Sequence, residues 1–249
     1  MTIKTYLNFF VFLLFLLTSK TLAFAQSEED VDGEVTQQIW LDMYPHLVLG
    51  EKWHYIGDFG FRKIVDENSW AQLFMRPAIK YQYSDILSFQ ISMSVAYDWS
   101  RLNEDHLLIT PRQGVRIDWP SFGPLNFYHL LRLEERISYK VSDWSHTVDL
   151  IGRYKIFGDY TFKLNERGRF WFISFYAEVF HNPNKKVEFN KNKFRTGIGL
   201  GYDPSNDWKY IFMLNWQGSQ TSEDQTQISD MIFQLKIYKT LRKWSKYLN

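Results

Sequence analysis

The chain has no cysteine among its 249 residues, and this absence removes several kinds of chemistry. There can be no disulfide, no thiolate nucleophile, no cysteine metal ligand and no N-terminal cysteine for the lipid anchor of a bacterial lipoprotein. The sequence also lacks an excess of one charge, because 29 lysines and arginines stand against 28 aspartates and glutamates. A nucleic-acid-binding protein normally gathers a basic excess on one face, so we expect no nucleic-acid partner.

Long apolar runs are confined to the N-terminus. Phe9 to Leu17 is unbroken, follows Lys4 and precedes the small-x-small pattern Ala23-Phe24-Ala25. This order predicts a secretory signal peptide over residues 1–25, since the run is shorter than the ~20 residues of a spanning helix. No apolar stretch of spanning length follows, so a mature protein held in a membrane would have to cross it as strands.

What the sequence does have is alternation, and the segment Leu87 to Arg101 shows it without error. Apolar side chains occupy every second position, and mostly polar ones lie between them. Because successive strand residues point to opposite faces, the segment predicts a strand with one apolar and one polar face. It exceeds the ~5–6 residues of an ordinary strand and the ~9–11 of a tilted transmembrane strand. Its apolar face ends in Tyr97 and Trp99, residue types that prefer the level of the lipid headgroups.

The same alternation recurs along the chain and predicts a single all-β domain. Candidate strands follow one another over residues 39–240, after a polar, acidic lead-in over residues 26–38 and before a polar tail over residues 241–249. We predict an antiparallel transmembrane β-barrel of about 10–12 strands, with a soluble β-sandwich as the alternative fold. The barrel interpretation places the protein in the outer membrane of a Gram-negative cell, with lipid as its partner.

The pattern leaves the number of strands open. It contains eleven candidates, whereas bacterial single-chain barrels have even strand numbers. Either residues 39–49 lie outside the barrel, or the candidate over residues 146–164 bends into two near Phe157-Gly158-Asp159. Both choices put the C-terminus in the periplasm and the longer loops after His181 and Gly218 outside the cell.

Arginine and carboxylate side chains share the polar faces of neighbouring candidates. Such faces suit a water-filled or ion-paired lumen, where planar bidentate pairs form. The lumen-facing charged residues predicted in this way are Arg76, Arg112, Arg116, Arg132, Glu134, Arg136, Asp149, Arg153, Glu178 and Arg195. The aromatic girdle predicted on the lipid side is Tyr97, Trp99, Trp119, Trp171, Trp208 and Trp216.

Several loose motifs recur in a characteristic order along the mature chain. They include Arg76-Pro77, Arg132-x-Glu134-x-Arg136, Arg153-Tyr154, Glu178 before His181-Asn182, and Asn192-x-x-Arg195-x-Gly197-x-Gly199. In this order the chain resembles the DUF2490 family of uncharacterised outer-membrane barrel proteins, which are common in Bacteroidota. The resemblance implies an outer-membrane barrel and brings no reaction, substrate or catalytic residue.

A catalytic constellation is not visible in the sequence. A lipid-modifying barrel enzyme would need a nucleophilic serine, a histidine base and an orienting polar group within reach. His129 lies well inside a candidate strand, but Ser138 on that strand points to the other face, and the adjacent Ser145 and His146 face opposite sides. We therefore expect no enzyme and no cofactor, and the absence of His-x-x-x-His spacing predicts no metal site.

Three functions stay open on the sequence alone. A small pore or uptake channel would favour anions, because inward basic residues outnumber inward acidic ones and basic rings select anions. A closed structural or adhesive barrel would use the same charges as an ion-paired core. A lipid-modifying enzyme is the third and has the least support.

Overall fold

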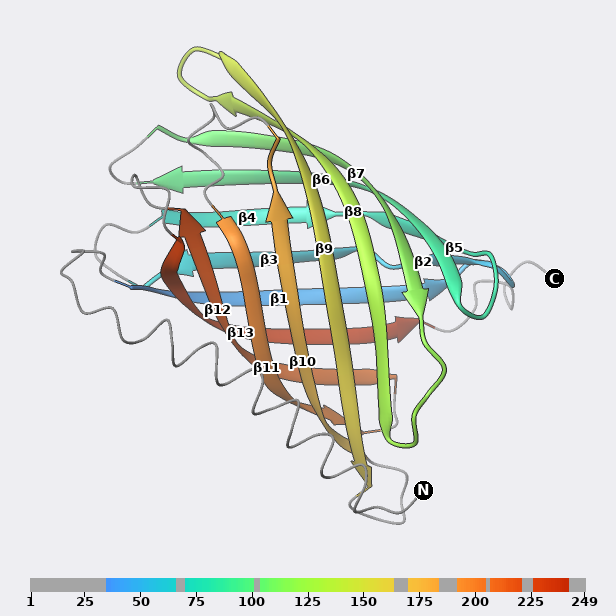
Figure 1. The fold of residues 1–249 in the computed structure, drawn as a ribbon. Coiled ribbons are helices and arrows are strands. Elements are labelled where there is room, and N and C mark those ends of the chain that lie inside the picture. Colours follow the sequence, from blue (N-terminus) through green and yellow to red (C-terminus); the bar gives the residue numbers. More distant parts are fainter. Residues whose placement is uncertain are drawn as a thin grey trace. The chain divides into compact units, whose positions relative to one another are not determined.

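The computed structural model describes residues 35–65, 70–100, 104–163, 170–183, 192–204, 207–220 and 226–241. The predicted signal peptide, most of the lead-in and the tail beyond Leu241 lie outside these ranges. The described residues contain only strands, joined in one closed sheet (Figure 1). The strands are β1 (Thr36–Val48), β2 (Trp53–Tyr55), β3 (Asp58–Ile64), β4 (Trp70–Arg76), β5 (Ala78–Gln82), β6 (Leu87–Ser100), β7 (His106–Asp118), β8 (Leu125–Lys140), β9 (His146–Lys163), β10 (Phe170–His181), β11 (Asn192–Asp203), β12 (Trp208–Gln220) and β13 (Thr226–Leu241). In these ranges no helix is long and apolar enough to cross a membrane.

The thirteen strands occupy 11 positions around the barrel. The pairs β2 with β3 and β4 with β5 each share one position, since both members lie against the same long neighbour. Pro77 separates β4 from β5, as expected of a residue that cannot donate a ladder hydrogen bond. The predicted all-β barrel is therefore confirmed, and the sandwich alternative is wrong because the sheet closes on itself.

The closure differs from the expected antiparallel one. β1 pairs with β13 in parallel register, from Thr36 opposite Asp230 to Leu47 opposite Leu241. Strand direction alternates around an all-antiparallel barrel, which therefore needs an even number of strands. A barrel with an odd number of positions closes through one parallel pair instead. Both proposed adjustments of the strand count are wrong, because residues 39–49 lie within the barrel and β9 continues through Gly158 as one strand.

The parallel pair also sets the two ends of the barrel. β1 begins at Thr36 and β13 finishes at Leu241, so the strands enter and leave at opposite ends. We call them the Thr36 end and the Leu241 end. β10 and β12 both finish at the Thr36 end, and the loops that follow them lie mostly outside the described residues. The first strand starts at Thr36 rather than at residue 39, because its pairing with β13 begins at Thr36, and the side chain of Gln38 already faces inward and donates to Asp230.

The strands are tilted against the barrel axis. Following paired residues from Asp42 in one direction leads to Thr147 of β9, whereas the other direction leads to Thr161 of the same strand. A barrel closes only with such a stagger, which tilts its strands. Inward side chains from many strands thereby reach the same level of the lumen.

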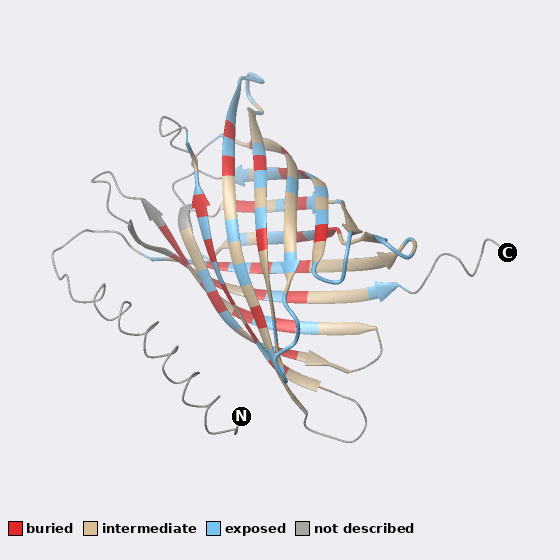
Figure 2. Cartoon of the chain, turned by 45° about the vertical axis from the view of Figure 1, so that its right-hand side comes forward, coloured by how far each residue is buried: buried red, intermediate tan, exposed pale blue. Residues whose placement is uncertain are grey.

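Polarity is inverted between the two faces of the sheet. Figure 2 shows buried and exposed residues alternating along single strands. Fully buried side chains include Glu134, Asn215 and Asp42, whereas Ile91 is 63% exposed and Leu131 is 59% exposed. The alternation along the sequence thus separates an apolar exterior from an interior that contains these polar side chains together with a small apolar cluster of Phe172, Tyr176, Ile211 and Met213.

The parallel closure predicts a specific cross-link. Leu41 and Leu235 are direct partners across β1 and β13, and both side chains face outward. Neighbouring strands lie about 4.8 Å apart, within the Cα separation of about 4.4–6.8 Å that a disulfide spans. We expect the Leu41→Cys/Leu235→Cys variant to cross-link under oxidation, read as a mobility shift on non-reducing gels.

The control for this cross-link is the pair Ile39→Cys/Leu235→Cys. Two positions along a strand add about 6.6 Å, so this pair is separated by about 8 Å and should not form a disulfide. Native cysteine is absent, so no other thiol can compete. Equal cross-linking of both pairs would contradict the register.

Candidate functional site: the charged lumen

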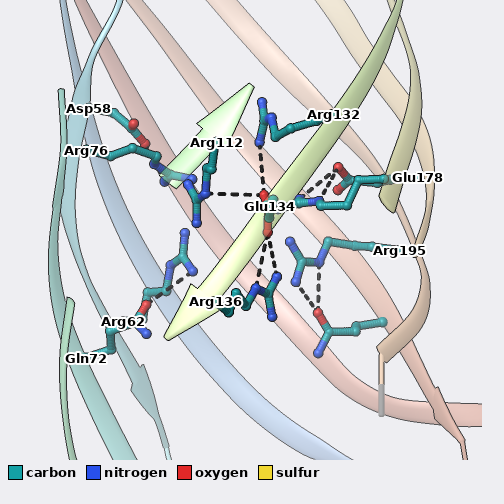
Figure 3. Close-up of polar contacts among 12 residues, drawn as sticks. Asp58, Arg62, Gln72, Arg76, Arg112, Arg132, Glu134, Arg136, Glu178 and Arg195 are labelled. Atoms are coloured by element: carbon teal, nitrogen blue, oxygen red, sulfur yellow. Dashed lines mark hydrogen bonds and ion pairs between the residues drawn. The ribbon is translucent and has the colours of Figure 1, made fainter. Parts of the chain in front are cut away.

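Glu134 is the centre of the lumenal charges. Its side chain, on β8, is 0% exposed. Its Oε1 lies 2.6 Å from Arg153 Nη1, 3.3 Å from Arg112 Nε and 3.6 Å from Arg132 Nη1, and its Oε2 lies 2.9 Å from Arg136 Nη2 (Figure 3). The Arg112 contact is close enough for an ion pair but is misaligned for a hydrogen bond. One carboxylate therefore serves four guanidinium groups.

The strand register explains why these groups meet. Arg132, Glu134 and Arg136 occupy alternate positions of β8 and so share its inward face. Arg112 of β7 is directly opposite Glu134, and Arg153 of β9 is directly opposite Arg132. Two guanidinium groups on adjacent strands would repel each other without a carboxylate between them.

A second carboxylate extends this charged cluster onto β10. Glu178 Oε1 accepts hydrogen bonds from Arg153 Nε at 3.1 Å and from Arg153 Nη2 at 2.8 Å. Arg153 thus bridges Glu134 and Glu178, and its guanidinium also lies 4.7 Å from the ring centre of Phe180. Charge-assisted contacts of this kind are the strong class of hydrogen bonds.

Other arginines of the lumen have partners of their own. Arg76 Nη2 donates to Asp58 Oδ2 at 2.6 Å, and Arg195 Nε donates to Gln217 Oε1 at 2.8 Å. Arg62 stacks over Trp40 with 4.0 Å between the guanidinium carbon and the ring centre. Arginine suits such positions because its planar group can stack and donate at once.

The ten predicted lumen residues lie in several parts of the barrel interior. The cluster around the two glutamates holds Arg112, Arg132, Glu134, Arg136, Arg153 and Glu178. Arg76 and Arg195 lie beside it, and Arg116 pairs with Asp118 nearer the Leu241 end. Asp149 is buried and accepts a hydrogen bond from Asn182 Nδ2 at 3.4 Å.

Sequence reasoning missed a layer of amides and carboxylates near the Thr36 end. Asp230 accepts from Gln38 Nε2 at 2.7 Å and from Gln217 Nε2 at 2.8 Å, and Asp42 accepts from Gln234 Nε2 at 2.5 Å. The sequence contained a signal, because Gln38 and Asp42 are an even number of residues apart on β1 and therefore share one face. It was obscured because Pro45 made this candidate look irregular.

A cavity of about 530 Å³ occupies the part of the lumen toward the Leu241 end. It reaches Val48, His54 and Thr240, which lie at that end of β1, β2 and β13. Eleven lysine and arginine side chains line it, against the four carboxylates of Asp42, Asp58, Asp159 and Glu178. Glu134 and Asp118 also pair with arginines that line the cavity. With these two, six carboxylates face eleven cations.

The predicted girdle residues are placed near both ends of the barrel. Tyr97, Trp99 and Trp216 lie toward the Thr36 end, and Trp119, Trp171 and Trp208 lie toward the Leu241 end. They group with further aromatic rings: Tyr97 with Trp99 at 6.0 Å, Trp119 with Phe127 at 5.7 Å, Trp171 with Tyr202 at 4.8 Å, and Trp208 with Tyr210 at 6.2 Å.

The histidines considered for catalysis have other surroundings. His129 faces outward, and its Nδ1 lies 2.5 Å from the hydroxyl of Tyr154 among aromatic rings. Ser138 contacts His106, with 3.1 Å between Oγ and Nδ1. Sequence reasoning missed this pair, because its members come from different strands. In the described ranges no group of three or more acidic or histidine side chains is placed to hold a metal ion.

Removing the central carboxylate should destabilise the barrel. Glu134→Gln leaves several buried guanidinium groups without their shared counter-charge, and breaking a buried ion pair in this way costs about 3–5 kcal/mol. We expect the free energy of unfolding, measured by denaturant titration of the folded protein in detergent, to fall by that order.

The matched control is Glu104→Gln. Glu104 Oε2 lies 3.0 Å from Lys140 Nζ, but both side chains are about half exposed. Exposed ion pairs often contribute nothing measurable, so this variant should unfold like the wild type. Equal losses in both variants would contradict the central role of Glu134.

Comparison with known proteins identifies the family of the chain. No curated protein matches the chain. The model of a family described as "Protein of unknown function (DUF2490)" matches residues 37–227, which run from the second residue of β1 to the start of β13. This span is more than half of the sequence and contains the charged cluster described above, so the chain belongs to the DUF2490 family.

Proposed function

We propose that the protein is an outer-membrane β-barrel whose lumen accepts small anionic solutes from the Leu241 end. The observation that carries the membrane part is the inverted polarity of the sheet. Exposed large apolar side chains occur on strand after strand, while carboxylates and amides are buried and the arginines beside them are partly buried. Soluble monomers rarely expose contiguous apolar patches beyond a few hundred Å². Such an exterior fits a lipid environment. In lipid, a closed barrel pairs all of its backbone N–H and C=O groups between neighbouring strands.

The height of the apolar band supports the same proposal. Trp208 and Trp216 lie on one strand, eight residues apart, near the two ends of the barrel. At about 3.3 Å per residue and a tilt of about 40°, they are separated by roughly 20 Å along the barrel axis. Transmembrane barrels carry an apolar band about 25 Å tall between two aromatic girdles.

The outer face is not wholly apolar. Gln113 of β7 and Glu135 of β8 are exposed on it, beside a place where the β7–β8 ladder skips Thr110 and Pro111. Glu135 lies four residues before Tyr139, toward the Thr36 end. A charge costs least near the interface of a membrane, so this position is tolerable in the proposed location.

The lumen supports an anionic solute because its cations outnumber its carboxylates. Near the Thr36 end it is filled, since Gln38, Trp40, Phe180, Gln217 and Asp230 are all buried. Passage through the barrel would therefore require this layer to move. The same filling favours the second candidate, a closed structural barrel. In the described part of the chain, no outward serine–histidine contact supports a lipid-modifying enzyme.

Cell fractionation tests the membrane part. We expect the protein in the outer-membrane fraction, resistant to carbonate extraction, with different gel mobility before and after boiling. Ile91→Arg would place a charge toward lipid at an expected cost of about 2–4 kcal/mol, whereas Ser92 faces the cavity and Ser92→Arg should be milder. Recovery as a soluble periplasmic protein, or equal loss of the folded form in both variants, would refute the proposal.

Bilayer recordings test the lumen. Under a salt gradient, we expect a reversal potential with the sign of anion selectivity, since basic side chains set the fixed charge that an ion meets. Arg132→Glu should weaken this selectivity because Arg132 lines the cavity, whereas Lys239→Glu should leave it unchanged because Lys239 lies over the outward ring of Trp208. Cation selectivity would contradict the charge argument, and complete absence of conductance would favour the closed barrel.

A further inference from the structure

We infer that the lumenal cavity contains a binding site for a phosphate-bearing solute, held by Lys155 and Lys236 beside the ring of Tyr176. The inference rests on the proposed function only in that the solute enters from the Leu241 end. Three features of the cavity carry it: the two lysines, the donors that surround them and the volume that they enclose.

Lys236 is 6% exposed and lines the cavity from β13. Lys155 lines it from β9. Within the described ranges, neither ammonium group has a hydrogen bond or an ion pair to a protein atom. Lys236 is buried and Lys155 is partly buried, and removing a charge from water without a partner is costly, so a counter-ion at this position would gain part of its binding free energy from relieving that cost.

The carboxylates closest in register are already engaged. Glu178, opposite Lys155, accepts both of its bonds from Arg153. Asp42, opposite Lys236, accepts through Oδ2 from Gln234 and Tyr44, while its Oδ1 has no hydrogen bond. Asp42 thus compensates part of the charge of Lys236 through space.

The two ammonium groups gather at one aromatic ring instead. Lys155 Nζ lies 3.9 Å from the centre of the Tyr176 ring, and Lys236 Nζ lies 5.5 Å from the same centre. A ring face attracts a cation more weakly than a carboxylate does. Two cations beside one neutral ring therefore form a place where an anion with two or more charges is favoured.

Guanidinium groups of the same cavity add donors with no acceptor. Arg112 Nε and Nη1, Arg62 Nε and Arg76 Nε are buried and lack a hydrogen-bond partner in the described structure. All three arginines line the cavity. Guanidinium groups match the geometry of phosphate oxygens, and lysine binds phosphate as a point charge.

The cavity is larger than one phosphate ion. Its volume of about 530 Å³ falls in the range of about 300–1,000 Å³ typical of small-molecule sites. Its walls include the stacked rings of Tyr44 and Tyr238, at 4.5 Å, and of Tyr128 and Phe157, at 5.0 Å. The phosphate is therefore one group of a larger molecule, whose remainder packs on these rings.

Calorimetric titration of the folded protein in detergent with inorganic pyrophosphate tests the site. We expect binding at low salt, weakened about tenfold or more in Lys155→Met and in Lys236→Met, since each removes a contact to a charged group. Methionine keeps the length of the side chain, and the gel shift on boiling verifies that each variant is folded. Lys236→Arg should bind within a few fold of the wild type.

Lys239→Met is the matched control, because Lys239 lies on the same strand and faces outward. It should bind pyrophosphate like the wild type. Absence of binding by folded wild-type protein, or an equal loss in Lys239→Met, would overturn the site. A soluble protein that binds pyrophosphate as expected would overturn the membrane proposal and leave the site standing.

The source of the phosphate is resolved by competition. A short-chain phosphatidic acid in mixed micelles presents the same group on a lipid. Displacement of pyrophosphate by this lipid supports a headgroup ligand, and its failure to displace supports a free solute. In both cases the cavity binds a phosphate group, and the competition decides only which molecule carries it.

Discussion

The barrel depends on a carboxylate that water does not reach. Glu134 is fully buried between four arginines, and the attraction among these five charges compensates for removing them from solvent. Arg153 connects this group to Glu178 on the next strand, so residues of β7 to β10 are tied together across the lumen. A shift by one residue would turn these charges outward, which makes the register strongly specified.

Closure imposes the second constraint. With an odd number of positions, one neighbouring pair must run in parallel, and that pair is β1 with β13. It brings Gln38 and Asp42, from the beginning of the barrel, against Asp230 and Gln234, from its last strand. The hydrogen bond between Gln38 and Asp230 lies in the filled part toward the Thr36 end, whereas Asp42 and Gln234 also line the cavity. The division into a filled part and a basic cavity therefore follows from how the sheet closes.

This division shapes what the lumen can do. Charges in the filled part are matched by close partners, whereas the cavity holds Lys155 and Lys236, whose ammonium groups lie beside the ring of Tyr176. An exterior of exposed apolar side chains and an interior with surplus positive charge are both incomplete without another molecule. The two partners proposed above, lipid on the outside and an anion on the inside, each supply what one of these surfaces lacks.

Alternation along Leu87–Ser100 and its neighbours was sufficient to predict the all-β fold and the inward and outward faces of the regular strands, because the two-residue period of a strand is a local property. It placed Arg132, Glu134 and Arg136 together on one face, and the order of motifs indicated the family. Local pattern could not show that β1 pairs with β13 in parallel, since that contact joins the two ends of the barrel. It also could not show that Ser138 meets His106, or that Lys155 and Lys236 share one ring. These contacts depend on stagger and tilt, which the tertiary structure alone decides because they are properties of the closed sheet.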